Sequence, residues 1–247
     1  MSKIRIISGL VAIAVVFGCG GANTNSLQPP DPVVAFINAS PDGAALDAFL
    51  NNIQLGNNVP YLSSSPRSGA VTTFRSVEPG EYDVRIEPDG APENGDVTVQ
   101  NLTRDTSTLT AALGLVDPAG DFNKRLQTFS FQVDRSKPNG EKARLVIIHA
   151  WIASPGFDTP AIDFRNPDDN PLTNVQNIDF GGNNTALIDS GNQTFVARIS
   201  GTEFEITPQA TFNFGAGKIY AAIVCGIEDE TGPRSPRIVF MELQPKQ

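Results

Sequence analysis

The sequence predicts an all-β protein built from two tandem antiparallel β-sandwich domains. Three observations lead to this prediction. The 247 residues include 22 glycines and 19 prolines, which suit short strands joined by tight turns. Apolar and polar residues alternate along several segments, as half-buried strands require. The stretch VVAFINASPDGAALDAFL at residues 33–50 also returns, altered, as RLVIIHAWIASPGFDTPAIDFR at residues 144–165.

Matching apolar faces extend this repeat over both halves of the chain. The alternating residues Tyr82, Val84 and Ile86 correspond to Phe195, Ala197 and Ile199. The remaining pairs of series are Leu109, Ala111, Leu113 and Leu115 with Ile219, Ala221, Ile223 and Cys225, and Phe129, Phe131 and Val133 with Val239, Met241 and Leu243. A spacing of about 110 residues is too long for a solenoid repeat and fits a duplicated domain.

The domain boundaries follow from this repeat. We expect the first β-sandwich at residues 33–137 and the second at residues 143–247, joined by a polar linker near residues 136–142. Each half has its own apolar faces and is expected to close a separate core. The alternative is one continuous barrel made from both halves.

The N-terminus predicts export and a lipid anchor. Lys3 and Arg5 precede an apolar run that is too short to span a bilayer, so residues 1–18 read as a cleaved signal peptide. The tetrapeptide Val-Phe-Gly-Cys ending at Cys19 resembles the lipobox of bacterial lipoproteins, which implies that Cys19 carries a diacylglycerol group. Several acyl chains on Cys19 would anchor the protein stably. Residues 19–32 lack the apolar residues needed to fold and are expected to form a flexible tether.

The resemblance to lipoproteins also suggests a location. In the sorting rule of enteric lipoproteins, Gly20 in place of an aspartate after Cys19 favours the outer membrane. We therefore expect the folded part to work at the surface of the bacterial envelope, on the periplasmic or the external side. The alternative is an ordinary secretory signal in which Cys19 has no role.

The charge of the chain excludes one class of partner. The formal net charge of −9 becomes −11 without residues 1–18, which contain two basic and no acidic residues. Such a surface repels phosphate backbones, so nucleic acid is not an expected partner. The expected partners are the membrane, through a lipid on the N-terminus, and an envelope protein or a glycan; the oligomeric state is left open.

A family resemblance agrees with the repeat. INASPDGAALDAFLNN and the later VEPGEYDVRI are similar to the opening motif and hairpin of a bacterial envelope family called domain of unknown function 4397. The resemblance implies tandem copies on exported proteins, a transthyretin-like or immunoglobulin-like sandwich, and no established catalytic residues. Asn38 stands where the family motif usually has histidine, whereas the second half keeps His149.

The repeated polar residues predict a structural role. We expect Asn38 to donate a hydrogen bond to Asp47, and His149 to donate one to Asp163 in the second half. A Ser154–His149–Asp163 triad is the hydrolase alternative, since imidazole could take the serine proton. No GxSxG elbow accompanies it. We therefore predict no enzyme and no catalytic residue.

Metal and cofactor sites are not predicted. The acidic segments 117–123, 168–170 and 228–230 offer oxygen ligands of the kind that Ca²⁺ uses, but none has the EF-hand spacing. A calcium-dependent adhesion module remains an alternative. One histidine and no CxxC pair disfavour zinc. Cys225 shares the parity of an apolar strand and is expected to be a buried, unreactive thiol.

The aromatic residues Trp151 and Phe157 are the candidate ligand contacts. Both follow the first strand of the second half, in a loop where they could touch a sugar ring or a protein. The alternative is that they close the end of the core, because large aromatic residues are usually buried. The sequence thus predicts a lipid-anchored, non-catalytic binding or structural module, with a glycan-binding or calcium-dependent adhesion module as the alternative.

Overall fold

A computed structural model describes the folded part of the chain at residues 29–43, 45–92, 95–118, 120–154, 156–167 and 175–246. Cys19 and the predicted signal peptide lie outside these residues. The described chain consists of β-strands and two short 3-10 helices, η3 (Phe122–Lys124) and η4 (Gly232–Arg234). This confirms the all-β class. None of its helices is long and apolar enough to span a membrane.

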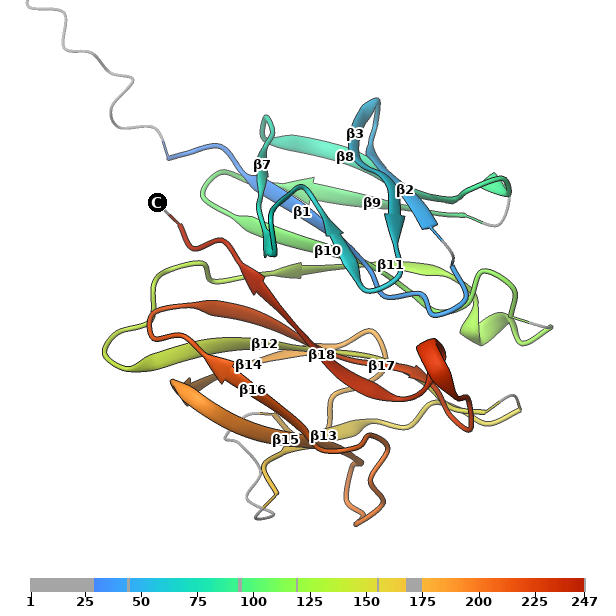
Figure 1. The fold of residues 1–247 in the computed structure, drawn as a ribbon. Coiled ribbons are helices and arrows are strands. Elements are labelled where there is room, and N and C mark those ends of the chain that lie inside the picture. Colours follow the sequence, from blue (N-terminus) through green and yellow to red (C-terminus); the bar gives the residue numbers. More distant parts are fainter. Residues whose placement is uncertain are drawn as a thin grey trace, which may run out of the picture.

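Four β-sheets lie on top of one another like layers (Figure 1). Sheet 1, uppermost in Figure 1, has the order β3 (Ile53–Pro60), β2 (Ala45–Leu50), β8 (Gly80–Pro88) and β9 (Asp96–Leu102). Sheet 2 follows with β11 (Gln127–Gln132), β10 (Ser107–Leu113), β1 (Val33–Asn38) and β4 (Ser63–Ser65), and β7 (Arg75–Ser76) also pairs with β1.

The second half of the chain supplies most of the other two layers. Sheet 3 has the order β14 (Asn183–Asp189), β12 (Lys142–Ile152), β17 (Ile219–Ile227), β18 (Arg237–Leu243), β6 (Val71–Thr72) and β5 (Arg67–Ser68). Sheet 4, lowest in Figure 1, contains β13 (Ile162–Arg165), β15 (Gly191–Ile199) and β16 (Ala210–Phe214). Most strand pairs are antiparallel, as predicted, but β1–β10, β12–β17 and the short β18–β6 pair are parallel.

Three hydrophobic cores separate the four sheets. The outer two cores lie inside the halves, and in the first of them Tyr82, Val84 and Ile86 share one buried face as predicted. The third core lies between sheets 2 and 3, where Leu109 and Ala111 of one half pack in the same cluster as Ala221 and Ile223 of the other. These residues were expected to close separate cores. Strands β1, β12 and β17 are apolar on both faces because each is covered on both sides.

The two halves repeat the same sheet order. In sheet 2 the order is β11-β10-β1-β4, and in sheet 3 it is β18-β17-β12-β14. The strand that corresponds to β14 is divided into β4 and β7 in the first half, and β5 and β6 lie between them in sequence. β5 and β6 pair with each other as a hairpin. This β5–β6 hairpin belongs to sheet 3, where Val71 and Thr72 pair with Glu242 and Leu243 of β18. The boundaries at residues 137 and 143 stay a prediction, because sheet 3 contains strands from both halves.

Candidate functional site

The predicted partners Asn38 and Asp47 bind a common third segment instead of each other. The Nδ2 atom of Asn38 donates to the carbonyl oxygen of Val59 over 2.9 Å. Asp47 accepts a hydrogen bond of 2.6 Å from the backbone N–H of Asn58. The two side chains therefore act on neighbouring residues of strand β3. Asn58 has a φ of 52°, a left-handed conformation that asparagine tolerates better than most residues.

The second half repeats this arrangement with His149. Its Nδ1 atom donates to the carbonyl oxygen of Ile178 over 2.9 Å. Asp163 accepts a hydrogen bond of 2.9 Å from the backbone N–H of Asn177, whose φ is 53°. Asp163 also forms an ion pair of 2.8 Å with Arg165. Burial opposes the charged form of Asp163, but hydrogen bonds from Arg165 and Asn177 hold its pKa below the ordinary value.

The predicted hydrogen bonds from Asn38 to Asp47 and from His149 to Asp163 are therefore absent between these described residues. In each half the two side chains instead bind the backbone of the same dipeptide, and this arrangement is called the clamp below. In each half a side chain of the first strand donates to a backbone carbonyl, and the aspartate accepts the N–H one residue earlier. The clamped dipeptides are Asn58-Val59 and Asn177-Ile178. Sequence reasoning missed these dipeptides, because a bond to the backbone leaves no side-chain signature.

His149 is fully buried, and its ring packs against two aromatic side chains. Its ring lies edge-on to Phe180, with centroids 5.9 Å apart, and stacks with Trp151 at 6.3 Å. Its Nε2 atom has no hydrogen-bond partner among the described residues. Burial lowers the pKa of His149 to about 4, although the bond to Ile178 opposes this shift. The imidazole is therefore neutral near pH 7.

The structure does not assemble the candidate hydrolase triad. The hydroxyl of Ser154 donates to Asp229 over 2.9 Å, and Asp163 binds Arg165 and Asn177. His149 has its hydrogen bond with Ile178 and is closed off from solvent. A nucleophile and its base must lie within hydrogen-bond reach of each other, and these described residues each have a different partner.

The two candidate ligand contacts differ sharply in exposure. Trp151 is 1% exposed and belongs to the core between sheets 3 and 4. Phe157 is 70% exposed, on the loop between β12 and β13. Trp151 therefore closes the end of a core, whereas Phe157 is available at the surface.

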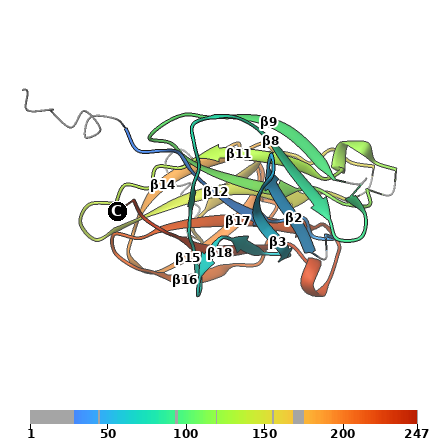
Figure 2. The same ribbon diagram turned by 90° about the horizontal axis from the view of Figure 1, so that it is seen from above.

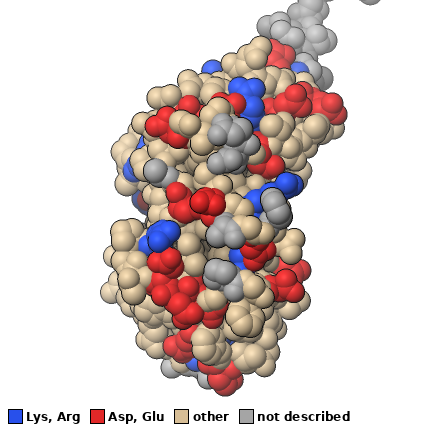
Figure 3. Space-filling model, turned by 90° about the vertical axis from the view of Figure 1, so that its right-hand side faces the viewer, with Lys and Arg blue, Asp and Glu red and all other residues tan. Residues whose placement is uncertain are grey.

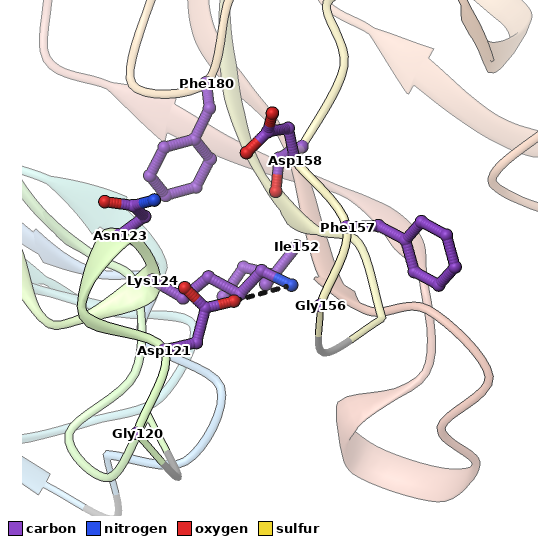
Figure 4. A pocket seen from close by; sticks show the side chains of 10 residues that line it. Gly120, Asp121, Asn123, Lys124, Ile152, Gly156, Phe157, Asp158 and Phe180 are labelled. Carbon is purple, nitrogen blue, oxygen red and sulfur yellow. Dashed lines mark ion pairs between the residues drawn. The ribbon is translucent and has the colours of Figure 1, made fainter.

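Lys124 holds this loop against the first half of the chain. It is 5% exposed and donates from Nζ to the carbonyl oxygens of Ala153, at 2.9 Å, and Ser154, at 2.5 Å. Asp121 forms an ion pair with it at 3.4 Å (Figure 4). A cavity of about 620 Å³ lies here, lined from both halves by Asp121, Lys124 and Asp158 among others.

A second hollow, of about 360 Å³, lies on another side of the same loop and is called the Trp151 hollow below. Its apolar lining is formed by Trp151, Ala153, Phe157, Pro160 and Ile199. Ser154 and the carboxylates of Asp158, Glu228 and Asp229 complete its lining. Ser154 donates to Glu228 from its backbone N–H at 2.8 Å and to Asp229 from its hydroxyl. These bonds fix the two carboxylates beside the hollow.

The loops around these hollows make one end of the molecule acidic. Figure 3 looks onto this end, where several groups of acidic side chains are visible with fewer basic side chains among them. A further hollow of about 420 Å³ is lined by Asp42, Asp117 and Glu230 together with Arg234. Within the described residues no three His, Cys, Asp or Glu side chains are placed to share a metal ion. The candidate calcium segment 168–170 lies outside the described residues.

Cys225 lies in the core between sheets 2 and 3 and is fully buried. Burial raises the pKa of its thiol to about 12. Because the thiolate is the reactive form, Cys225 is unreactive at neutral pH, as predicted. Cys19 lies outside the described residues.

Comparisons with known proteins identify the family of the chain. No curated protein matches it. Among solved structures it is similar to the Bacillus anthracis TIE protein, with 11% identity and a TM-score of 0.24 over 79% of this chain, which spans only 34% of that protein. It is also similar to a family 26 carbohydrate-binding module of Eubacterium rectale solved with maltoheptaose, with 9% identity, a TM-score of 0.24, and coverage of 87% of this chain and 98% of that one.

A family model matches residues 32–165, which cover the first half and the opening strands of the second. The chain therefore belongs to the family described as domain of unknown function (DUF4397).

Proposed function

We propose that the protein is a lipid-anchored component of the bacterial envelope whose folded part is a non-catalytic binding module. The observation that carries this proposal is the position of the Trp151 hollow and the two neighbouring hollows. They lie at the end of the molecule that includes the loop between β12 and β13, which is called the loop end below. That end lies opposite to the end where the segment leading into β1 enters the fold (Figures 1 and 2). A tether from Cys19 would therefore leave the hollows facing away from the lipid.

Contacts at the opposite end, where residues 29–32 lead into β1, support an orientation with the hollows away from the lipid. The carbonyl oxygen of Pro30 accepts a hydrogen bond of 2.8 Å from the N–H of Asp105, and Arg104 pairs with Asp31. The side chain of Lys246, near the C-terminus, also pairs with Asp105. These contacts fix the point at which a tether would leave the fold. A ligand approaching the other end would meet no obstruction from the membrane.

The polar residues support binding over catalysis. His149 is the only histidine in the sequence, and its ring is enclosed by Trp151, Phe180 and the backbone of Ile178. Ser154 holds acidic residues of the neighbouring loop in place. These residues stabilise the loop end and leave its hollows open for a ligand.

Glycan binding is the second candidate, favoured by Phe157. An exposed aromatic ring can stack on the apolar face of a sugar, and neighbouring carboxylate or amide groups can bind its hydroxyls. Asp158 and Asn123 line the same cavity as Phe157. A calcium-dependent module has no comparable support from the described residues.

Replacing Cys19 tests the anchor. We expect Cys19→Ser to move the protein from the membrane fraction to the aqueous fraction, and mass spectrometry of the natural protein to find an acylated Cys19. Cys225→Ala is the matched control and should leave the protein membrane-bound. Separation of inner and outer membranes tests the location suggested by Gly20. An unmodified Cys19 thiol would contradict the proposal.

Site-specific crosslinking in intact cells tests the binding role. A photoreactive amino acid at Phe157 should capture a defined partner. The same group at Val99 on β9, which is 59% exposed and lies in sheet 1, is the matched control. Equal capture from both positions, or none from Phe157, would contradict a binding site at the loop end.

A further inference from the structure

We propose that the Trp151 hollow receives a basic side chain, lysine or arginine, from a partner protein. This inference rests on the proposed binding function and assigns its ligand chemistry. Lysine and arginine combine a long apolar stem with a charged head, and they bury the stem while the head stays near polar groups. The hollow offers a matching combination of apolar and acidic surface.

The apolar part of the hollow fits the stem. Trp151, Pro160 and Ile199 line it, and Trp151 is held rigidly because it is 1% exposed and packed in a core. The Nε1 atom of Trp151 has no acceptor among the described residues. This atom is closed off from solvent, so a carbonyl oxygen of a peptide ligand could accept from it only after the indole ring shifts towards the hollow.

The acidic part fits the head. Asp158, Glu228 and Asp229 line the hollow, and none of its lining residues is basic. Two other carboxylates at this end form ion pairs: Glu230 pairs with Arg234 at 3.1 Å and Asp121 with Lys124 at 3.4 Å. Glu228 and Asp229 accept hydrogen bonds from the neutral residue Ser154. Arg234 lies on the side of the neighbouring 420 Å³ hollow, which Glu228 and Asp229 also line, so on the side of the Trp151 hollow a cationic ligand would meet these carboxylates without a basic residue among its lining.

The ring of Phe157 adds a stacking surface. It is 70% exposed, and Figure 4 shows it pointing away from Lys124 and Asp121. A guanidinium or ammonium group over such a ring is attracted to its face. A neutral sugar would also stack there, but it would bring no positive charge to the three carboxylates that line the hollow. An anionic ligand would be repelled by them. The charge of the hollow therefore favours a cation.

Trp151 is the only tryptophan in the chain, so its fluorescence reports on the hollow. The full chain, purified in detergent, is titrated with a hexa-arginine peptide in about 0.15 M salt. We expect a saturable change in Trp151 emission that weakens as salt is raised. The double variant Glu228→Gln/Asp229→Asn keeps acceptors for Ser154 and removes two charges, so binding should fall about fivefold.

Two further variants distinguish binding in the Trp151 hollow from attraction of the peptide to the overall negative charge of the protein. Glu81→Gln/Asp83→Asn removes two exposed charges from the outer face of sheet 1 and should leave the affinity within about twofold. Phe157→Ala keeps every charge and should weaken binding about two- to fivefold through loss of the stacking surface. Thermal melting of all variants shows that they remain folded.

Several outcomes would overturn the inference. One is an equal loss of affinity in the sheet 1 variant, which would mean that the peptide binds the overall negative charge. Another is the absence of a saturable signal with hexa-arginine. A third is a signal with a neutral glucose oligosaccharide only, which would make the hollow a glycan site. That last result would leave the proposed binding function intact, whereas an unacylated Cys19 would contradict the anchor and leave this inference standing.

Discussion

Replacing His149 by asparagine tests whether burial of this ring makes stability depend on pH. The first half of the chain already has asparagine at the corresponding position, where Asn38 donates to the carbonyl oxygen of Val59. In the variant His149→Asn, the new amide can make the same bond to Ile178. The change therefore removes the titrating group and can keep the clamp. Contacts with Trp151 and Phe180 are reduced.

The size of the effect follows from the pKa of His149. Burial lowers it to about 4 in the folded protein, from 6.5 in the unfolded chain. The unfolded state therefore binds the proton more tightly, and the free energy of unfolding falls as the pH drops from 6.5 towards 4. At pH 5 the loss relative to pH 8 is about 2 kcal/mol, and at pH 4 it reaches about 3 kcal/mol.

Urea unfolding at pH 8 and pH 5 measures this loss. We expect the variant to be less stable than the natural chain at pH 8, by about 1–3 kcal/mol, because ring contacts are lost. Its further loss between pH 8 and pH 5 should be about 2 kcal/mol smaller than in the natural chain, since the carboxylates are common to both proteins. The control Ile223→Val lowers stability in another core and should keep the natural pH dependence. If His149→Asn has the same pH dependence as the natural chain, the reasoning is wrong.

Three other predictions concern stability. Asp163→Ala removes the acceptor for Asn177 and leaves a partly buried arginine unpaired, so we expect a loss of about 2–4 kcal/mol in urea unfolding; Asp163→Asn should lose less. Lys124→Met removes the donor that holds residues 153–159, and hydrogen exchange in that loop should become faster, with little change in sheet 1 if the effect is local. Ile223→Ala should lower stability by about 2–5 kcal/mol, and circular dichroism should show both halves unfolding in one transition; a loss below 1 kcal/mol would contradict tight packing there.

Much of the fold could be predicted because alternation reports which side of a strand is buried. The series Tyr82, Val84 and Ile86 lies on one buried face. Alternation cannot report which sheet covers that face. The Leu109 and Ile219 series were therefore assigned to separate cores, whereas they meet in a shared core between sheets 2 and 3. The parallel pairing of β1 with β10 was missed for a related reason, since strand direction leaves no mark on periodicity.

The polar site was predicted only in part. Recurrence of an amide or imidazole in the first strand, and of an aspartate in the second, predicted a direct hydrogen bond within each pair, whereas the four side chains bind backbone groups of a third segment. Their shared partner could not be inferred, because backbone N–H and carbonyl groups occur at every residue. A comparison of the halves around Asn58 and Asn177 would have offered one clue, since both precede a β-branched apolar residue.

The β5–β6 hairpin makes the assembly of sheet 3 depend on the first half of the chain. Residues 67–72 leave the ribosome long before β18, so the final strand meets a neighbour that has already been synthesised. Expression of residues 143–247 alone would leave one side of β18 without that neighbour and would uncover the apolar surface shared with sheet 2. A chain reduced to its second half would thus expose both an unpaired strand edge and an apolar sheet face, and we expect it to self-associate.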